Sequence, residues 1–393
     1  MYGVWLQSWF GWLADSFIEV VGGWMASSPA WLTGLVCDGL LSGVAAILSF
    51  LPHILMLFLF LSILEDTGYM SRVAFIMDRV FRKFGLSGKA FYPLLMCFGC
   101  GVPGVMATKT LESEKERKIS LLISPFFSCG AKLPIWLAFA GVLFGGEHGD
   151  LVVYSIYLAG IVVAIVCALI LKFAMNKEET APFIMELPDY HLPQFKNLML
   201  HLWDKLKHYL VKAGTIIASA IVVLWFLSNF SFDFWNGMVD DVNVSMLGQI
   251  GQILQYLFYP MGWAMGDYGW QLVVSALSGL LAKEEVVATM EVLAGGMGVE
   301  FMIASMTTPA AFAFMLFNLL CIPCMAMVGA VAGELKSGKK LLKALGFWML
   351  VAYIVSGLTF WCFTYWWVGA IVGVAIVAFI LVLYVKYKKR KSN

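Results

Sequence analysis

The chain has 393 residues, of which 61% are hydrophobic and 13% are charged, and its mean hydropathy is +0.85. A soluble domain usually carries about 25% charged residues, whereas apolar runs of roughly 20 residues, as found here, match membrane-crossing helices. The net charge of +1 excludes a basic field for nucleic acid, and the eight cysteines lack the spacing of a secreted disulfide framework. Because lipid offers no partner to unpaired backbone groups, we expect an all-α polytopic membrane protein.

The positions of Lys and Arg predict the topology, since these residues gather on the cytoplasmic side of membrane proteins. Apart from Lys132 and Lys283, every Lys and Arg lies in one of four patches, which we place in the cytoplasm. The patches are 72–118, 172–212, 336–343 and 386–391. Each stretch between two patches is then expected to cross to the outer side of the membrane and return.

The N-terminal segment, 1–39, is expected to be an outer or interfacial segment. Trp5, Trp9 and Trp12 recur at helical spacing, which suits an amphipathic helix at the membrane surface. An outer position requires a span upstream, so we expect the chain to start inside a longer parent protein. The alternative is that residues 4–25 cross the membrane themselves.

A first gate-like repeat is predicted at 40–173. Its first span, 43–64, runs inward and ends at Glu65 and Asp66. Segment 90–107 begins and ends near cytoplasmic charge and is interrupted by glycines and a proline, which predicts a re-entrant hairpin. A broken span, 119–144, is interrupted at 128–134, and 151–173 returns to the cytoplasm.

A cytoplasmic linker, 174–207, is expected to lead to a second repeat, 208–365, with the same plan upside down. Its parts are an outward span at 208–228, a hairpin at 270–303 with a break at Gly295 and Gly296, an inward span at 309–332 broken at 318–324, and a span at 343–365. Trp263 and Tyr268 are expected to anchor it at the outer interface. Residues 366–393 supply a last transmembrane helix and a basic tail. The whole would be about seven transmembrane helices plus two re-entrant hairpins in two inverted gate-like repeats, a plan of secondary transporters.

Polar and soft side chains lie at the breaks, where exposed backbone is tolerated only beside a cavity or inside protein. Thiolates suit soft and borderline cations and carboxylates suit harder ones, so a mixed site would suit a borderline first-row ion. The residues at the breaks are Cys97, Cys100, Ser128, Cys129, Lys132, Lys283, Glu284, Glu285, Cys321 and Cys324.

Each of these residues also has an ordinary interpretation. A membrane cysteine often serves as small apolar filler, which is how we interpret Cys37, Cys167 and Cys362. Glu65 and Asp66 end a span, where carboxylates can be boundary residues. Intramembrane charges are costly and normally paired, so the buried charges could form a structural ion pair, such as Lys132 with a glutamate of the other half.

Several long motifs are similar to those of one family. LEDTGYMSRVAFIMDRV (64–80), GLSGKAFYPLLMCFGCGVPGVMATKTLE (85–112), SPFFSCGAKLPIW (124–136), KAGTIIASAIVVLWFLS (212–228), GLLAKEEVVAT (279–289) and LCIPCMA (320–326) resemble the membrane domain of FeoB ferrous-iron transporters. The resemblance runs in order from about residue 40 to 345. It implies Fe²⁺ uptake across the bacterial inner membrane by a multi-pass protein with two inverted gate-like repeats.

The resemblance implies a set of metal residues. Cys100, Cys129 and Cys324 match family cysteines, and Glu65 and Glu284 match acidic positions. Residues with supporting or ion-pairing roles would be Lys132, Lys283, Asp66, Glu285 and Ser128. The chain departs from the family pattern at Gly101, where Asn is common, and by carrying Glu285, Cys97 and Cys321.

The family's GTPase domain is missing from this sequence. No G-x-x-x-x-G-K-[ST] phosphate loop occurs, so we expect no GTP site, no cofactor and no enzymatic activity in this chain. The expected partners are membrane lipid, a GTPase domain on a separate or removed polypeptide, a small FeoA-like cytosolic protein and further copies of the chain.

The leading hypothesis is therefore an Fe²⁺ permease with a path lined by thiols and carboxylates. The first alternative is a transporter of Mn²⁺ or Zn²⁺ with the same architecture. A second alternative is a membrane thiol oxidoreductase that uses the two CxxC pairs, and a third is a purely structural membrane subunit.

Overall fold

The computed structural model describes residues 2–25, 29–174, 190, 196, 199–200, 202–203, 207, 219, 221–223, 225–231, 244–294 and 298–365. These residues fold into helices joined by short turns, and no β-strand element occurs among them. Four expected features lie wholly or mostly outside this part of the chain: the linker 174–207, the span 208–228, the break at Gly295 and Gly296, and the last helix of 366–393.

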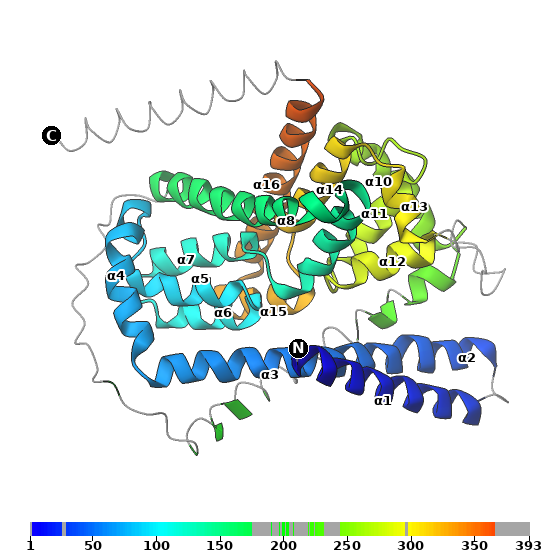
Figure 1. The fold of residues 1–393 in the computed structure, drawn as a ribbon, viewed down its shortest axis with the longest axis horizontal. Coiled ribbons are helices and arrows are strands. Elements are labelled where there is room, and N and C mark those ends of the chain that lie inside the picture. The colour runs from blue at the N-terminus through cyan, green and yellow to red at the C-terminus, as the bar shows by residue number, and fades with distance from the viewer. Residues whose placement is uncertain are drawn as a thin grey trace.

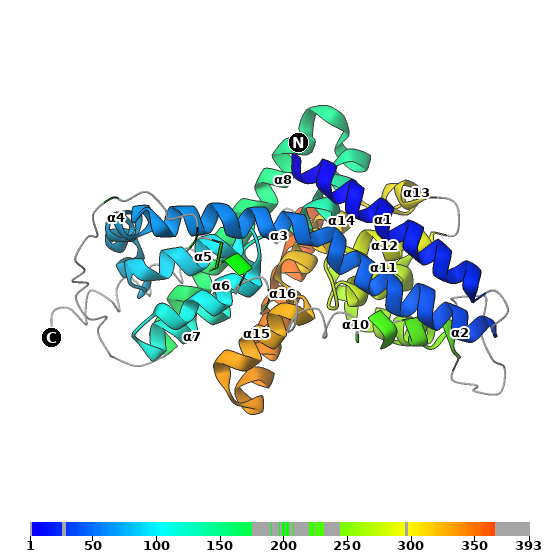
Figure 2. The same cartoon turned by 90° about the horizontal axis from the view of Figure 1, so that it is seen from below.

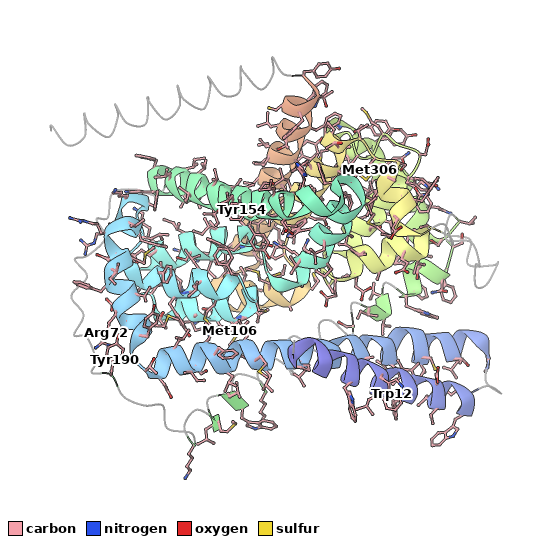
Figure 3. The ribbon with its side chains drawn as sticks, viewed as in Figure 1. Trp12, Arg72, Met106, Tyr154, Tyr190 and Met306 are labelled. Carbon is pink, nitrogen blue, oxygen red and sulfur yellow. The ribbon has the colours of Figure 1, made fainter. Side chains whose placement is uncertain are left out.

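The N-terminal part is a helical hairpin that lies along one side of the molecule (Figure 1). Helix α1 packs against the long helix α3, and the π-helical turn η1 leads into α3. Trp12 on α1 is 65% exposed and points away from the rest of the protein (Figure 3). The elements are α1 (Tyr2–Trp24), α2 (Ala30–Gly34), η1 (Leu35–Leu41) and α3 (Ser42–Asp66).

The predicted hairpin at 90–107 consists of two short helices, α5 and α6, that pack against each other. Helix α4 precedes them, and the cation of Arg72 on α4 lies 3.5 Å from the ring centre of Tyr190 (Figure 3). The elements of this part are α4 (Tyr69–Phe84), η2 (Gly88–Ala90), α5 (Phe91–Cys97), α6 (Gly101–Ala107), η3 (Thr108–Thr110) and α7 (Glu114–Ile123).

The predicted break at 128–134 is present, because the chain leaves α7 through the short turns η4 (Ser124–Phe126) and η5 (Gly130–Lys132) before α8 (Leu133–Ala174) begins. Helix α8 includes both the second half of the broken span and the returning span. It bends at Gly145, whose φ of 60° is accessible to glycine without a steric penalty.

The second half contributes α10 (Met246–Phe258), η7 (Tyr259–Met261), α11 (Gly269–Ser278), α12 (Glu285–Leu293), α13 (Val299–Ala304), α14 (Thr308–Leu320), α15 (Met325–Leu335) and α16 (Gly338–Thr364). The group α4–α7 and the group α10–α13 lie at opposite ends of the molecule, with α14, α15 and α16 between them (Figures 1 and 2). The predicted break at 318–324 is present from residue 321 to 324, since α14 continues to Leu320, and the chain also leaves the α-helical conformation at 279–284, beside Lys283 and Glu284.

Helix α14 forms the centre of the core and packs against α8 and α16. Phe314 on α14 stacks on Phe139 of α8 with their ring centres 5.2 Å apart, and Trp263 meets Phe314 edge-on at 5.2 Å. Trp263 is only 1% exposed, so the expectation that it anchors the outer interface is wrong. Its aromatic neighbours are Phe258, five residues earlier in the chain, and Phe314 and Phe317 of α14, which only the tertiary packing brings to it.

Four helical stretches among the described residues are long and apolar enough to cross a membrane: Glu114–Gly145, His148–Phe173, Thr308–Leu335 and Gly338–Thr364. They correspond to the expected spans 119–144, 151–173, 309–332 and 343–365. The helical class of the fold is therefore confirmed, while the count of seven spans and the inverted repeat stay predictions.

Candidate functional site

A cavity of about 590 Å³ lies where the helix breaks of the two halves meet. The turns before α6 and after η4 contribute from the first half, and the turns before α12 and α15 contribute from the second. Its polar or sulfur-bearing lining includes Cys97, Cys100, Cys129, Lys132, Lys283, Glu284, Glu285, Cys324 and Met327. The sequence prediction that chemistry gathers at the breaks thus corresponds to one shared cavity.

The three cysteines predicted as metal residues occupy equivalent local positions. Cys100 directly precedes α6, Cys129 directly precedes η5, and Cys324 directly precedes α15. All three are partly exposed and line the cavity. Cys97 also lines it but is buried, and Cys321 is buried and does not line it. A residue before a helix has extended backbone, so its side chain leaves the helix axis and can face an open space.

Close packing around the glycines of the first break holds this arrangement in place. A Cβ at Gly99 would lie 2.5 Å from Leu57 on α3, and one at Gly101 would lie 2.3 Å from Met327 Sδ on α15. Glycine at both positions therefore leaves room for these side chains, and a larger residue at either position would require Leu57 or Met327 to move. The amide of Gly130 also donates to the carbonyl of Gly99, at 3.3 Å, which ties the Cys129 turn to the Cys100 turn.

The two buried lysines have unexpected partners. Lys132 Nζ donates to the carbonyl oxygens of Leu319 and Pro125, at 2.7 and 3.0 Å. Lys283 Nζ donates to Cys321 Sγ at 2.9 Å. Among the described residues, neither lysine has a carboxylate within 4 Å, so the alternative interpretation, an ion pair of Lys132 with a glutamate of the other half, is wrong. Main-chain carbonyls and a thiol satisfy these ammonium groups instead.

The acidic candidates separate into two places. Glu284 and Glu285 line the cavity at the start of α12. Glu65 lies at the end of α3, where its carboxylate accepts a hydrogen bond of 3.0 Å from the Tyr92 hydroxyl, and Asp66 is the last residue of α3. These last two residues do not line the cavity.

Ser128 is buried and accepts a hydrogen bond of 3.2 Å from Trp136 Nε1, so its hydroxyl supports the start of α8 rather than facing the cavity. In the part of the chain that the structure describes, no three His, Cys, Asp or Glu residues lie close enough to hold one metal ion together. Cys100, Cys129, Cys324 and Glu284 thus line one space without forming a closed coordination sphere.

Sequence reasoning missed Met327. Its thioether, a soft ligand, lines the cavity one helical turn after Cys324, against the glycine that follows Cys100. The spacing C-x-x-M at 324–327 was the available signal, but methionine is common in membrane helices and the pattern alone is weak.

All eight cysteines are free thiols. In the first CxxC pair, Cys97 Sγ donates to the carbonyl of Pro93 at 3.2 Å, and in the second, Cys321 accepts from Lys283. Cys97 and Cys321 are therefore each engaged by another group of the protein, whereas Cys100 and Cys324 are the more exposed member of each pair and line the cavity.

Comparison with known proteins identifies the family to which the chain belongs. A model described as Gate, nucleoside recognition, matches residues 47–143 and 210–338, and a model described as ferrous iron transport protein B C terminus matches 153–205. The Fe(2+) transporter FeoB of Staphylococcus aureus strain COL is 38% identical over 372 residues, which cover 90% of this chain and 55% of that protein. The chain belongs to the FeoB family.

A second FeoB relative, from Escherichia coli strain K12, is 42% identical over 272 residues, which cover 69% of this chain and 34% of that protein. The chain thus spans about half, or less, of the length of these curated relatives. No solved structure matches it.

The first segment of the Gate match contains Cys100, Cys129 and Lys132, and the second contains Lys283, Glu284 and Cys324. The cavity therefore lies between the two matched segments of this FeoB membrane portion.

Proposed function

We propose that this chain forms the ion path of a bacterial inner-membrane permease for Fe²⁺, and that the ion passes the thiols and carboxylate of the central cavity. The names of the FeoB relatives support the choice of substrate. The observation that carries the proposal is that Cys100, Cys129 and Cys324 come from three separate helix breaks and line one space.

The chemistry of the lining supports a borderline ion. Thiolates and a thioether favour soft or borderline metals, and carboxylates add affinity for harder ones, so Fe²⁺ suits the mixture better than Mg²⁺ or Ca²⁺ does. An ion path needs sites that bind strongly enough to admit the ion and weakly enough to release it. Separate ligands around an open cavity meet that requirement better than a closed cage of four ligands would.

In this proposal two gate-like repeats, 40–173 and 208–365, flank the cavity, and Glu65 lies near the cytoplasmic end of the path with Asp66. Lys132, Lys283, Glu285 and Ser128 support the breaks. The chain itself is not an enzyme. It works in lipid with a GTPase domain, and a FeoA-like protein and further copies of the chain are additional partners.

The test is Fe²⁺ uptake into liposomes that hold the chain, under reducing conditions, with Mn²⁺ and Zn²⁺ as competitors. We expect saturable Fe²⁺ uptake that unlabelled Fe²⁺ inhibits more strongly than Mn²⁺ or Zn²⁺ does. We expect this uptake to be lost in the triple variant Cys100→Ser, Cys129→Ser, Cys324→Ser. The matched control replaces Cys37, Cys167 and Cys362, which do not line the cavity.

Each other outcome selects an alternative. Stronger inhibition of uptake by Mn²⁺ or Zn²⁺ than by Fe²⁺ would favour the alternative of a Mn²⁺ or Zn²⁺ transporter with the same architecture. A reversible disulfide between Cys97 and Cys100, or between Cys321 and Cys324, with no metal uptake would favour the thiol oxidoreductase. Uptake that survives the triple replacement would remove the thiols from the path.

A further inference from the structure

The side chain of Lys132 ends in a ring of main-chain oxygens. Lys132 is 3% exposed, and its ammonium lies 2.7 Å from the carbonyl oxygen of Leu319, 3.0 Å from that of Pro125 and 3.5 Å from that of Phe127. An ammonium has three N–H donors, so three carbonyl acceptors can use all of them. None of the three acceptors carries a formal charge, and the ring contains no carboxylate.

The local sequence explains why these carbonyls are free. The residue four positions after Leu319 is Pro323, which has no N–H and so cannot donate to the Leu319 carbonyl as the next helical turn would. The last carbonyls of α14 therefore need other partners. Pro125 and Phe127 lie where the chain turns out of η4, and Phe127 already has extended backbone, with ψ of 135°. Carbonyls at helix ends also carry partial negative charge, which favours a cation.

The ring joins the two halves of the protein. Pro125 and Phe127 belong to the first matched Gate segment and Leu319 belongs to the second. Lys132 lines the cavity together with Pro125 and Phe127, while Leu319 is fully buried behind it. Burying a charge is costly unless it is well partnered, so a shift of one half against the other by the width of a hydrogen bond would leave the ammonium with too few partners.

We infer that the three carbonyls form a binding site for a small monovalent cation, and that the Lys132 ammonium is a tethered cation which fills this site and fastens the two halves together beside the cavity. Backbone carbonyls that replace a hydration shell are the usual ligands of K⁺. Shortening Lys132 should therefore expose a site for free ammonium or K⁺. The inference rests on the proposed function only where it concerns transport.

The test measures the melting temperature of the purified chain in detergent at one ionic strength, with chloride salts of choline, ammonium, methylammonium or K⁺. In choline, we expect Lys132→Ala to melt lower than the unaltered chain. Ammonium, methylammonium or K⁺ should raise the melting temperature of Lys132→Ala by several degrees more than that of the unaltered chain, because a ligand that binds only the folded state stabilises it.

The matched control is Lys283→Ala, which removes the other buried lysine but leaves a thiol, not carbonyls, without its partner. Its melting temperature should respond to these cations no more than that of the unaltered chain. Lys132→Met, which fills the space with an uncharged side chain, should stay destabilised in every salt. Equal cation responses in all variants, or a Lys132→Met protein as stable as the unaltered chain, would overturn the inference.

If Lys132→Ala does not fold in choline, the folded yield after extraction in ammonium or K⁺ becomes the measurement. A yield restored by either cation supports the site, and a yield that no cation restores overturns it. Fe²⁺ uptake in the same variants is a separate readout. If the unaltered chain takes up no Fe²⁺, the proposed function fails, while the melting data still decide whether the carbonyl site exists.

Discussion

Replacing Gly160 by Ala should loosen the wall of the cavity. Gly160 lies on α8 against η4, and a Cβ at this position would lie 2.5 Å from the main-chain oxygen of Phe126 and 3.1 Å from the side chain of Leu319. Because ordinary contacts of this kind lie at 3.4–4 Å, the rigid η4 backbone would have to move. The neighbouring carbonyls that bind Lys132 would move with it.

The magnitude follows from two opposing effects. Overpacking of a buried position typically costs about 1–3 kcal/mol. Alanine in place of a helical glycine gains up to about 1 kcal/mol. The matched control is Gly141→Ala on the same helix, where an added Cβ meets no atom within 4 Å. The gain is common to both variants, so Gly160→Ala should be less stable than Gly141→Ala by about 1–3 kcal/mol.

The assay is the thermal unfolding of both variants in one detergent, followed by helical circular dichroism. We expect Gly141→Ala to melt at or above the temperature of the unaltered chain and Gly160→Ala to melt below Gly141→Ala. Equal melting temperatures for the two variants would refute the close approach of α8 to η4 and, with it, the geometry of the Lys132 ring.

Two further predictions concern contacts between the halves. Lys109→Met should lower the free energy of unfolding by about 1–3 kcal/mol, because the buried Glu334 carboxylate, which lies 3.0 Å from the Lys109 ammonium, loses that partner. The control Lys118→Met breaks only an exposed pair with Glu114 and should lower it by under about 0.5 kcal/mol. Comparable thermal stabilities of the two variants would contradict this. Trp348→Phe removes a 2.8 Å hydrogen bond that the fully buried indole donates to the α7 backbone, and it should lower the free energy of unfolding by about 1–3 kcal/mol. Trp361→Phe should have a smaller effect, because the Trp361 indole is partly exposed. Denaturant midpoints of the two tryptophan variants test this order.

The sequence was most informative where local rules apply. Glycine and proline mark helix breaks, so the hairpin around Cys100 and the breaks at 128–134 and 318–324 could be predicted from residue types alone. The soft and acidic side chains at those breaks were also visible. A plan of two repeats with broken helices predicts a site between the repeats. In the structure the residues at the breaks line one cavity.

The parts that could not be predicted depend on contacts between distant segments. Lys132 binds the carbonyl of Leu319, 187 positions away, and a carbonyl leaves no mark in a sequence because every residue has one. Trp263, expected at an interface, is buried because the packing of α14 adds Phe314 and Phe317 to its local neighbour Phe258. The Met327 side chain fits beside Gly101 because glycine has no side chain there, and this contact between α15 and α6 is not apparent from the sequence.

Whether Fe²⁺ contacts the cavity thiols can be measured by X-ray absorption spectroscopy of Fe²⁺ bound to the purified chain under reducing conditions. We expect sulfur in the first coordination shell of the iron, lost in the triple serine variant of Cys100, Cys129 and Cys324 and retained when Cys37, Cys167 and Cys362 are replaced. A first shell of oxygen and nitrogen alone in the unaltered chain, with the ion still bound, would contradict it.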